Sequence, residues 1–242
     1  AMETVDDKFE YVFSTWWPQV PEINALIGYM KNKGYSRIAL VRDNDAFNTK
    51  FTELLGKALP STMTVVNTTS FSIGTTDFRT VILKLREAKP DAVVLEMQDT
   101  SQLGPFMKQA KELGLKSQVI SSTSAESQAN LDKFPGYFDG LVYTFPDMDE
   151  TFKLAELRKE SPKNTGPSFA NAYNAAAILI KAIEEAEDGD IKAALLRVNV
   201  AGAGIRSVSF DVNRQIKDAA FKIKTVKNNA FQIVMIYAGA IN

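Results

Sequence analysis

The feature that most constrains this chain is a regular alternation of short β-rich runs with segments of helical period. Residues 37–41 form a short run of the buried-strand type, and the apolar residues Phe51, Leu54, Leu55 and Ala58 then recur on one face of a helix. Such a run followed by an amphipathic helix is half of a βαβ unit, in which the next strand returns parallel to the first.

The same pattern repeats along the first 145 residues. We expect further strands at 63–67, 92–95, 117–121 and 141–144, after an opening strand at 11–13, with helical stripes near 23–34, 78–85 and 103–114. Strands that alternate with helices of this length predict an α/β fold, a doubly wound parallel sheet.

The second half changes character. Residues 151–160, 169–185 and 191–198 read as three helices with no strand between them, and the breaker-rich segment 161–167 separates the first two. A strand at 207–211 and a hairpin follow, in which 221–225 alternates against 231–235 across Asn228-Asn229.

Composition excludes many kinds of chemistry. The 242 residues include no histidine and no cysteine, which removes the usual triad base, thiol catalysis, Fe–S clusters and most zinc sites. A formal charge of −1 argues against a broadly basic nucleic-acid binder. No signal peptide or membrane span is visible, and no motif indicates a cofactor or a metal.

The loops that follow the strands are where a ligand is expected, because open parallel sheets bind ligands beyond the carboxyl ends of their strands. Each polar or aromatic residue there also has a structural alternative: a tryptophan can be core, an acid solvated, a hydroxyl only a helix cap. The candidates for ligand binding are Trp16, Trp17, Asp45, Phe47, Gln98, Ser122, Thr123 and Glu126.

The order of segments resembles the branched-chain amino-acid (Leu/Ile/Val) binding proteins of ABC transporters, which have the type I periplasmic binding fold. The resemblance runs through YSRIALVRDNDAFNTKF, DFRTVILKLREAKPDAVVLEMQDTSQLGPFMKQAKELGL, FANAYNAAAILIKAIEEA and VSFDVNRQIKDAAFKIKTVKNNAFQIV. It spans nearly the whole chain, and the ordered set carries it rather than any single motif.

The resemblance implies a two-lobed, hinged receptor that closes on a small solute and delivers it to an ABC permease in the periplasm or outside the cell. It matches Phe47 to an aromatic that stacks on the ligand and Gln98 to a second contact that is aromatic in relatives. In relatives an acid of the next loop often holds the ligand's ammonium group. In this sequence Thr123 stands nearest to that position, and Glu126 follows a few residues later.

Family members begin with a Gly-rich half-lobe, and the resemblance of this sequence starts after it. We therefore expect one complete lobe, residues 16–146 with 206–242, and an incomplete second lobe, residues 1–15 with 147–205. The helices of the incomplete lobe would expose apolar faces, and such faces usually find a partner, which predicts a homo-oligomer.

Three functions remain open at this point. The leading one is non-catalytic binding of a small solute, an amino acid or a related carboxylate or amide, for ABC-type uptake. The second is a ligand-sensing domain that regulates a partner protein. The third is a small α/β enzyme that uses Asp43, Asp45 or Glu126 as a general base.

Overall fold

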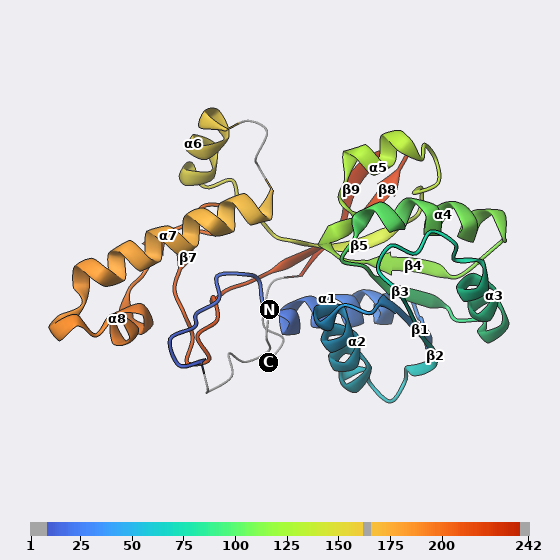
Figure 1. Ribbon diagram of the computed structural model, residues 1–242, viewed down its shortest axis with the longest axis horizontal. Helices are drawn as coiled ribbons and strands as arrows, with labels where there is room; N and C mark the ends of the chain where they lie inside the picture. Colours follow the sequence, from blue (N-terminus) through green and yellow to red (C-terminus); the bar gives the residue numbers. More distant parts are fainter. Residues whose placement is uncertain (1–8, 162–165, 238–242) are drawn as a thin grey trace. The chain divides into compact units, whose positions relative to one another are not determined.

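The computed structural model describes residues 9–161 and 166–237. These residues form two compact units. Unit 2 comprises Glu22–Phe145 and Phe221–Tyr237, and unit 1 comprises the described residues before Glu22 together with those of Pro146–Ala220. Figure 1 shows the elements of both units.

Unit 2 is built on a seven-stranded sheet with the order β2-β1-β3-β4-β5-β8-β9. The five strands from β2 to β5 in this order pair in parallel with their neighbours among these five. Strands β8 and β9 pair antiparallel. This is the doubly wound α/β sheet that the sequence predicts. The strands are β1 (Arg37–Asp43), β2 (Thr64–Phe71), β3 (Ala92–Glu96), β4 (Gln118–Ser121), β5 (Val142–Pro146), β8 (Phe221–Lys227) and β9 (Ala230–Tyr237).

Helices cover both faces of this sheet (Figure 1). One hydrophobic core cluster lies under α3 and α4, where Phe78 makes edge-on contacts with Phe71 and Phe106 at centroid distances of 5.1 and 5.4 Å. The helices of unit 2 are α1 (Gln19–Asn32), which begins at the unit boundary, α2 (Ala46–Ala58), α3 (Arg79–Ala88), α4 (Leu103–Glu112) and α5 (Gln128–Lys133).

The predicted hairpin is confirmed. Asn228 and Asn229 both have positive φ, 53° and 58°, between β8 and β9. Two left-handed residues in sequence are what a two-residue turn needs to match the twist of its strands, and asparagine tolerates that conformation better than most side chains.

Unit 1 is mainly helical, as predicted, with α6 (Phe152–Glu160), α7 (Pro167–Glu185), α8 (Ile191–Arg197) and the two short strands β6 (Val200–Ala201) and β7 (Ser207–Val208). Asn174 of α7 is buried, and its amide exchanges two hydrogen bonds with the backbone of Ala203, at 2.7 and 3.0 Å. This pair fixes α7 to the segment that leads into β7.

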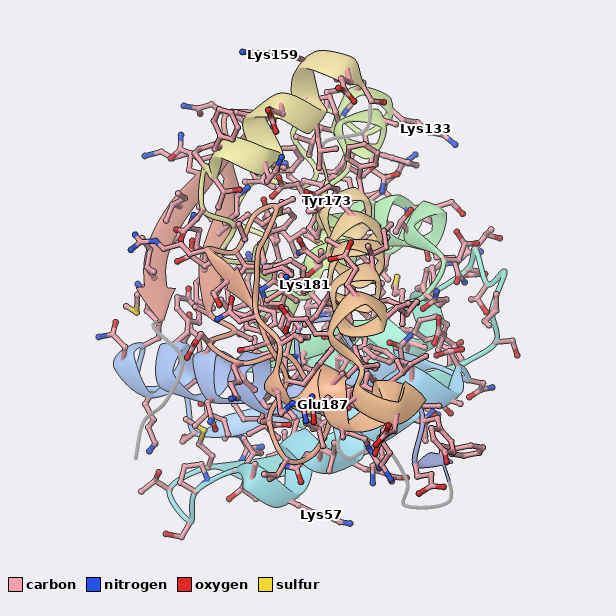
Figure 2. The ribbon with its side chains drawn as sticks, turned by 90° about the vertical axis from the view of Figure 1, so that its left-hand side faces the viewer. Lys57, Lys133, Lys159, Tyr173, Lys181 and Glu187 are labelled. Atoms are coloured by element: carbon pink, nitrogen blue, oxygen red, sulfur yellow. The ribbon has the colours of Figure 1, made fainter. Side chains whose placement is uncertain are left out.

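One face of α7 is apolar and exposed. Leu179, Ile180 and Ile183 are 44%, 57% and 55% exposed. Figure 2 labels Tyr173 and Lys181 along this helix and Glu187 just after its end. In the described ranges, 9–161 and 166–237, no helix is long and apolar enough to cross a membrane.

Two strand predictions in unit 1 are wrong. Residues 11–13 form no strand, and an isolated bridge joins only the next residue, Ser14, to Gln215. The strand expected at 207–211 is limited to Ser207–Val208, since Phe210 pairs only through a single bridge to Ile216. Apolar, β-prone residues do not make a strand without a neighbouring strand to pair with. The breaker segment 161–167 lies partly outside the described residues.

The compact units also differ from the predicted lobe boundaries. Residues 16–21 and 206–220, expected in the complete lobe, belong to unit 1. For 206–220 the reason is local pairing within unit 1: Phe13 packs against Phe210 at a centroid distance of 5.0 Å, and the Asp147 N–H donates to the Ala220 carbonyl at 2.8 Å.

Candidate functional site

The carboxyl edge of the unit 2 sheet holds the candidate site. The chain passes from β1 to β2 on one side and later returns to β3 on the other, so β1 and β3 are neighbours whose following loops diverge. A crevice at such a switch point is the usual ligand site of an open α/β sheet.

The carboxylate of Asp43, the last residue of β1, joins these two loops. It is fully buried and accepts hydrogen bonds from the Gln98 N–H at 2.7 Å, from the Asn48 amide at 2.8 Å and from the Asp45 N–H at 3.2 Å. Three donors compensate the burial of this group. Asp43 therefore holds the loop after β3 against the first turn of α2.

Phe47 stands in that first turn and is 36% exposed. Asp45 precedes it as the N-cap of α2, and its carboxylate accepts from the N–H groups of Phe47 at 2.7 Å and Asn48 at 3.3 Å. The cap orients the start of the helix, so Phe47 presents part of its ring at the edge of the sheet. The Asp45 carboxylate itself binds backbone N–H groups.

The loops after β3 and β4 bring further polar groups to the same edge. Gln98 is exposed, and Ser122 and Thr123, directly after β4, are half-buried. The Asn130 amide donates to the Thr100 carbonyl at 2.9 Å and so ties these two loops together. The structure thus places Phe47, Gln98, Ser122 and Thr123 at the ends of three adjacent strands.

Glu126 is already engaged by other side chains. Its carboxylate forms an ion pair with Lys224 of β8 and accepts a hydrogen bond from the Tyr143 hydroxyl at 2.7 Å. Burial is the main cause that raises the pKa of Tyr143, and the hydrogen bond to Glu126 and the charge of Glu126 raise it further. The Tyr143 hydroxyl therefore keeps its proton and donates a hydrogen bond to Glu126. The Lys224 ammonium also lies over the Phe145 ring, 4.6 Å from its centroid. Glu126 fastens the hairpin to β5.

The two tryptophans belong to unit 1, whereas the other candidates belong to unit 2. Trp17 is 2% exposed, so its ring is a core residue, which is the structural alternative that the sequence leaves open for a tryptophan. Trp16 is half-buried and meets Trp17 edge-on at a centroid distance of 5.9 Å.

Two buried acids were not singled out from the sequence. Glu22 of α1 is 7% exposed and accepts a hydrogen bond from the Thr144 hydroxyl, and burial raises its pKa to about 7. Glu96 is the last residue of β3. Burial and the charges of Glu22 and Asp43 raise its pKa well above the usual range, although a hydrogen bond from Ser122 acts in the opposite direction. Its Oε1 has no hydrogen-bond partner among the described residues.

The exposed groups of this edge suit recognition. They are a phenyl ring, an amide and hydroxyls, which contact a ligand without reacting with it. Within residues 9–161 and 166–237, no group of three or more acidic side chains is placed to hold a metal ion.

A sheet of this topology, with a polar and aromatic carboxyl edge, defines a ligand-binding α/β protein. The chain belongs to the periplasmic binding protein family, whose model matches residues 2–230. The comparison with curated proteins by sequence gives no match.

Solved structures share the fold at low identity. A leucine-binding protein of Thermotoga maritima is 17% identical with a TM-score of 0.82, and the match covers 95% of this chain and 69% of that one. A branched-chain amino-acid substrate-binding protein of Streptococcus pneumoniae with isoleucine is 18% identical with a TM-score of 0.74, covering 96% and 70%. A solute-binding protein of R. palustris with benzoate is 14% identical with a TM-score of 0.78, covering 96% and 67%.

These matches confirm the type I periplasmic binding fold expected from the segment order. The chain spans about two thirds of the length of these three structures.

Glu22 gives a pH test of this geometry. An acid whose pKa is about 7 when folded, against an ordinary 4.5, is protonated in both states below pH 4.5 and costs nothing there. Between pH 4.5 and 7 the Glu22 carboxyl is ionised in the unfolded chain but still protonated in the folded one, so the free energy of unfolding falls as pH rises. Above pH 7 the whole loss applies, roughly 3 kcal/mol.

We expect Glu22→Gln, which cannot ionise, to match the parent near pH 4 and to be more stable than the parent at pH 8. Urea unfolding at both pH values measures the difference, with Glu53→Gln, at an exposed position of α2, as the control. Equal stability of Glu22→Gln and the parent at pH 8 would show that the Glu22 carboxyl does not carry this burial cost.

Proposed function

We propose that the protein binds a small solute at the carboxyl edge of unit 2, without catalysis, as the receptor of an ABC-type uptake system. The observation that carries the proposal is the Asp43 carboxylate, which fixes the loops bearing Phe47 and Gln98 side by side at the switch point of the sheet. Pre-formed loops of this kind lower the entropy cost of binding.

The ligand class is an amino acid or a related carboxylate or amide. Relatives of the same fold were solved with isoleucine and with benzoate, a branched aliphatic amino acid and an aromatic acid. In the proposed mode the Phe47 ring packs against the apolar part of the solute, while Gln98, Ser122 and Thr123 exchange hydrogen bonds with its polar groups. Trp16 belongs to unit 1, and its contact with a ligand stays a prediction from the sequence. Since Glu126 is paired with Lys224, it is not assigned to the ligand.

The partner in this proposal is an ABC permease, and the location is the periplasm or the cell exterior. Both rest on membership of the periplasmic binding protein family. Copurification of a membrane permease with the protein, dependent on the solute, is the direct test of this part.

The binding site can be tested with Phe47→Ala. Truncating the ring removes its contact area with the solute, so we expect affinity to fall about tenfold, the effect of one well-placed aromatic contact. Thermal shift against a panel of amino acids, aromatic acids and short amides finds the binder, and calorimetry then measures its affinity.

Phe152→Ala is the matched control, because Phe152 is an exposed ring of α6 in unit 1, 75% exposed. It should leave affinity unchanged. If Phe47→Ala binds as tightly as the parent, the ligand site is elsewhere. If no member of the panel binds the parent, the proposed solute class is wrong.

We also propose that unit 1 self-associates through the apolar face of α7. Three neighbouring exposed side chains, Leu179, Ile180 and Ile183, form an apolar patch, and burial of such a patch between two copies is favourable.

Light scattering after size exclusion tests this association. We expect the double variant Ile180→Lys/Ile183→Lys to be monomeric at concentrations where the parent is oligomeric, since burying two added charges is costly. Leu83→Lys, at a 50% exposed position of α3, should leave the parent's state unchanged. A parent that stays monomeric at all accessible concentrations would contradict the proposal.

A further inference from the structure

Two hollows adjoin at the amino edge of the unit 2 sheet, the opposite end of the strands from the candidate ligand site. Their volumes are about 730 and 440 Å³. They share lining residues, so they form one continuous depression, here called the basal groove. The shared residues are Tyr35, Asp91, Leu115, Lys116 and Ser117.

The basal groove concentrates positive charge in a chain whose net charge is −1. Its larger hollow is lined by Lys33, Arg86, Lys89 and Lys116, and by one acid, Asp91. That acid is occupied: Oδ2 accepts from the N–H groups of Ser36 and Arg37, both at 2.8 Å, and these bonds lower the pKa of Asp91. The smaller hollow adds Lys111 and Asp139.

The helix ends at this edge do not account for the cations. Helices α1, α3 and α4 end here, and positive side chains are stabilising near helix C-termini. However, carbonyls at each of these helix ends already have donors. The N–H groups of Gly34 and Tyr35 cap α1, and those of Gly114 and Leu115 cap α4. The Arg37 guanidinium donates to the Ala88 and Lys89 carbonyls at the end of α3.

Three cations of the groove are therefore left over. Arg86, Lys89 and Lys116 are exposed, and among the described residues none has a hydrogen bond or an ion pair from its side chain. Lys33, by contrast, lies over the Tyr29 ring, 5.7 Å from its centroid, and Lys111 donates to the Gly136 carbonyl at 3.2 Å. The floor between the three free cations is apolar, made of Leu85, Pro90 and Leu115.

We propose that the basal groove binds an acidic, extended segment of a partner protein. Carboxylates of such a segment would pair with Arg86, Lys89 and Lys116, and its apolar side chains would lie on the floor beside Tyr35. An open groove of this volume is wider than a small ion needs, and charge complementarity of this kind sets both the rate and the choice of partner. The proposal is independent of which solute binds at the other edge.

The probe is a fluorescein-labelled decapeptide of glutamates with a central leucine, and its anisotropy reports binding to the whole chain at low and at physiological salt. The double variant Lys89→Gln/Lys116→Gln should bind about fivefold more weakly and show a smaller salt dependence, as expected for two lost surface ion pairs. The control is Lys50→Gln/Lys57→Gln on α2, which makes the same change in net charge at exposed positions. Lys57 points away from the protein in Figure 2.

Three outcomes overturn the proposal. The first is no binding of the peptide at low salt. The second is an equal loss of affinity in both double variants, which would mean that the overall charge of the protein, not the groove, attracts the peptide. The third is that inorganic polyphosphate binds with the same affinity and the same dependence on Lys89 and Lys116, which would mean a general anion patch. Selective weakening of the peptide by the groove variant supports the proposal.

Discussion

The hydrogen bonds of Asp43 are the constraint on which the candidate site depends. A carboxylate fully buried at the end of a strand is unfavourable unless donors surround it, and here the donors come from the loop after β3 and from the start of α2. The requirement to satisfy one buried charge thus fixes the relative position of two loops. Phe47 and Gln98 reach the same edge because Asp43 accepts from the Gln98 backbone and from Asp45 and Asn48, which flank Phe47.

The acids on this side of the sheet have different roles because their surroundings differ. Asp43 has three donors, whereas Glu22 has the Thr144 hydroxyl and Glu96 has an oxygen with no partner among the described residues. Burial then favours the protonated form of the last two, and their pKa values rise. Glu22 and Glu96 therefore lower the free energy of unfolding as pH rises.

The sequence predicts well what depends on neighbouring residues. The alternation of runs and helical stripes indicates the sheet, and Asn228-Asn229 marks the hairpin because both residues tolerate positive φ. It does not show partners that are distant in the chain. Nothing near Glu126 indicates that Lys224 pairs with it, and the β-prone residues 11–13 form no strand because no strand lies beside them. Asp45 lies between these two cases, because an acid directly before a helix is compatible both with an N-cap and with a ligand-binding residue. Glu96 had one visible signal, a charge that ends an apolar run.

The central claim is that a solute binds at the carboxyl edge of unit 2. Amide chemical shifts in a ¹H–¹⁵N spectrum, recorded as the tightest binder of the solute panel is added, test it most directly. The account predicts that the largest shifts fall in the loops around Asp45–Phe47, Gln98 and Ser122–Thr123. Shifts confined to the amino edge, around Tyr35 and Lys116, with those loops unchanged, would contradict it.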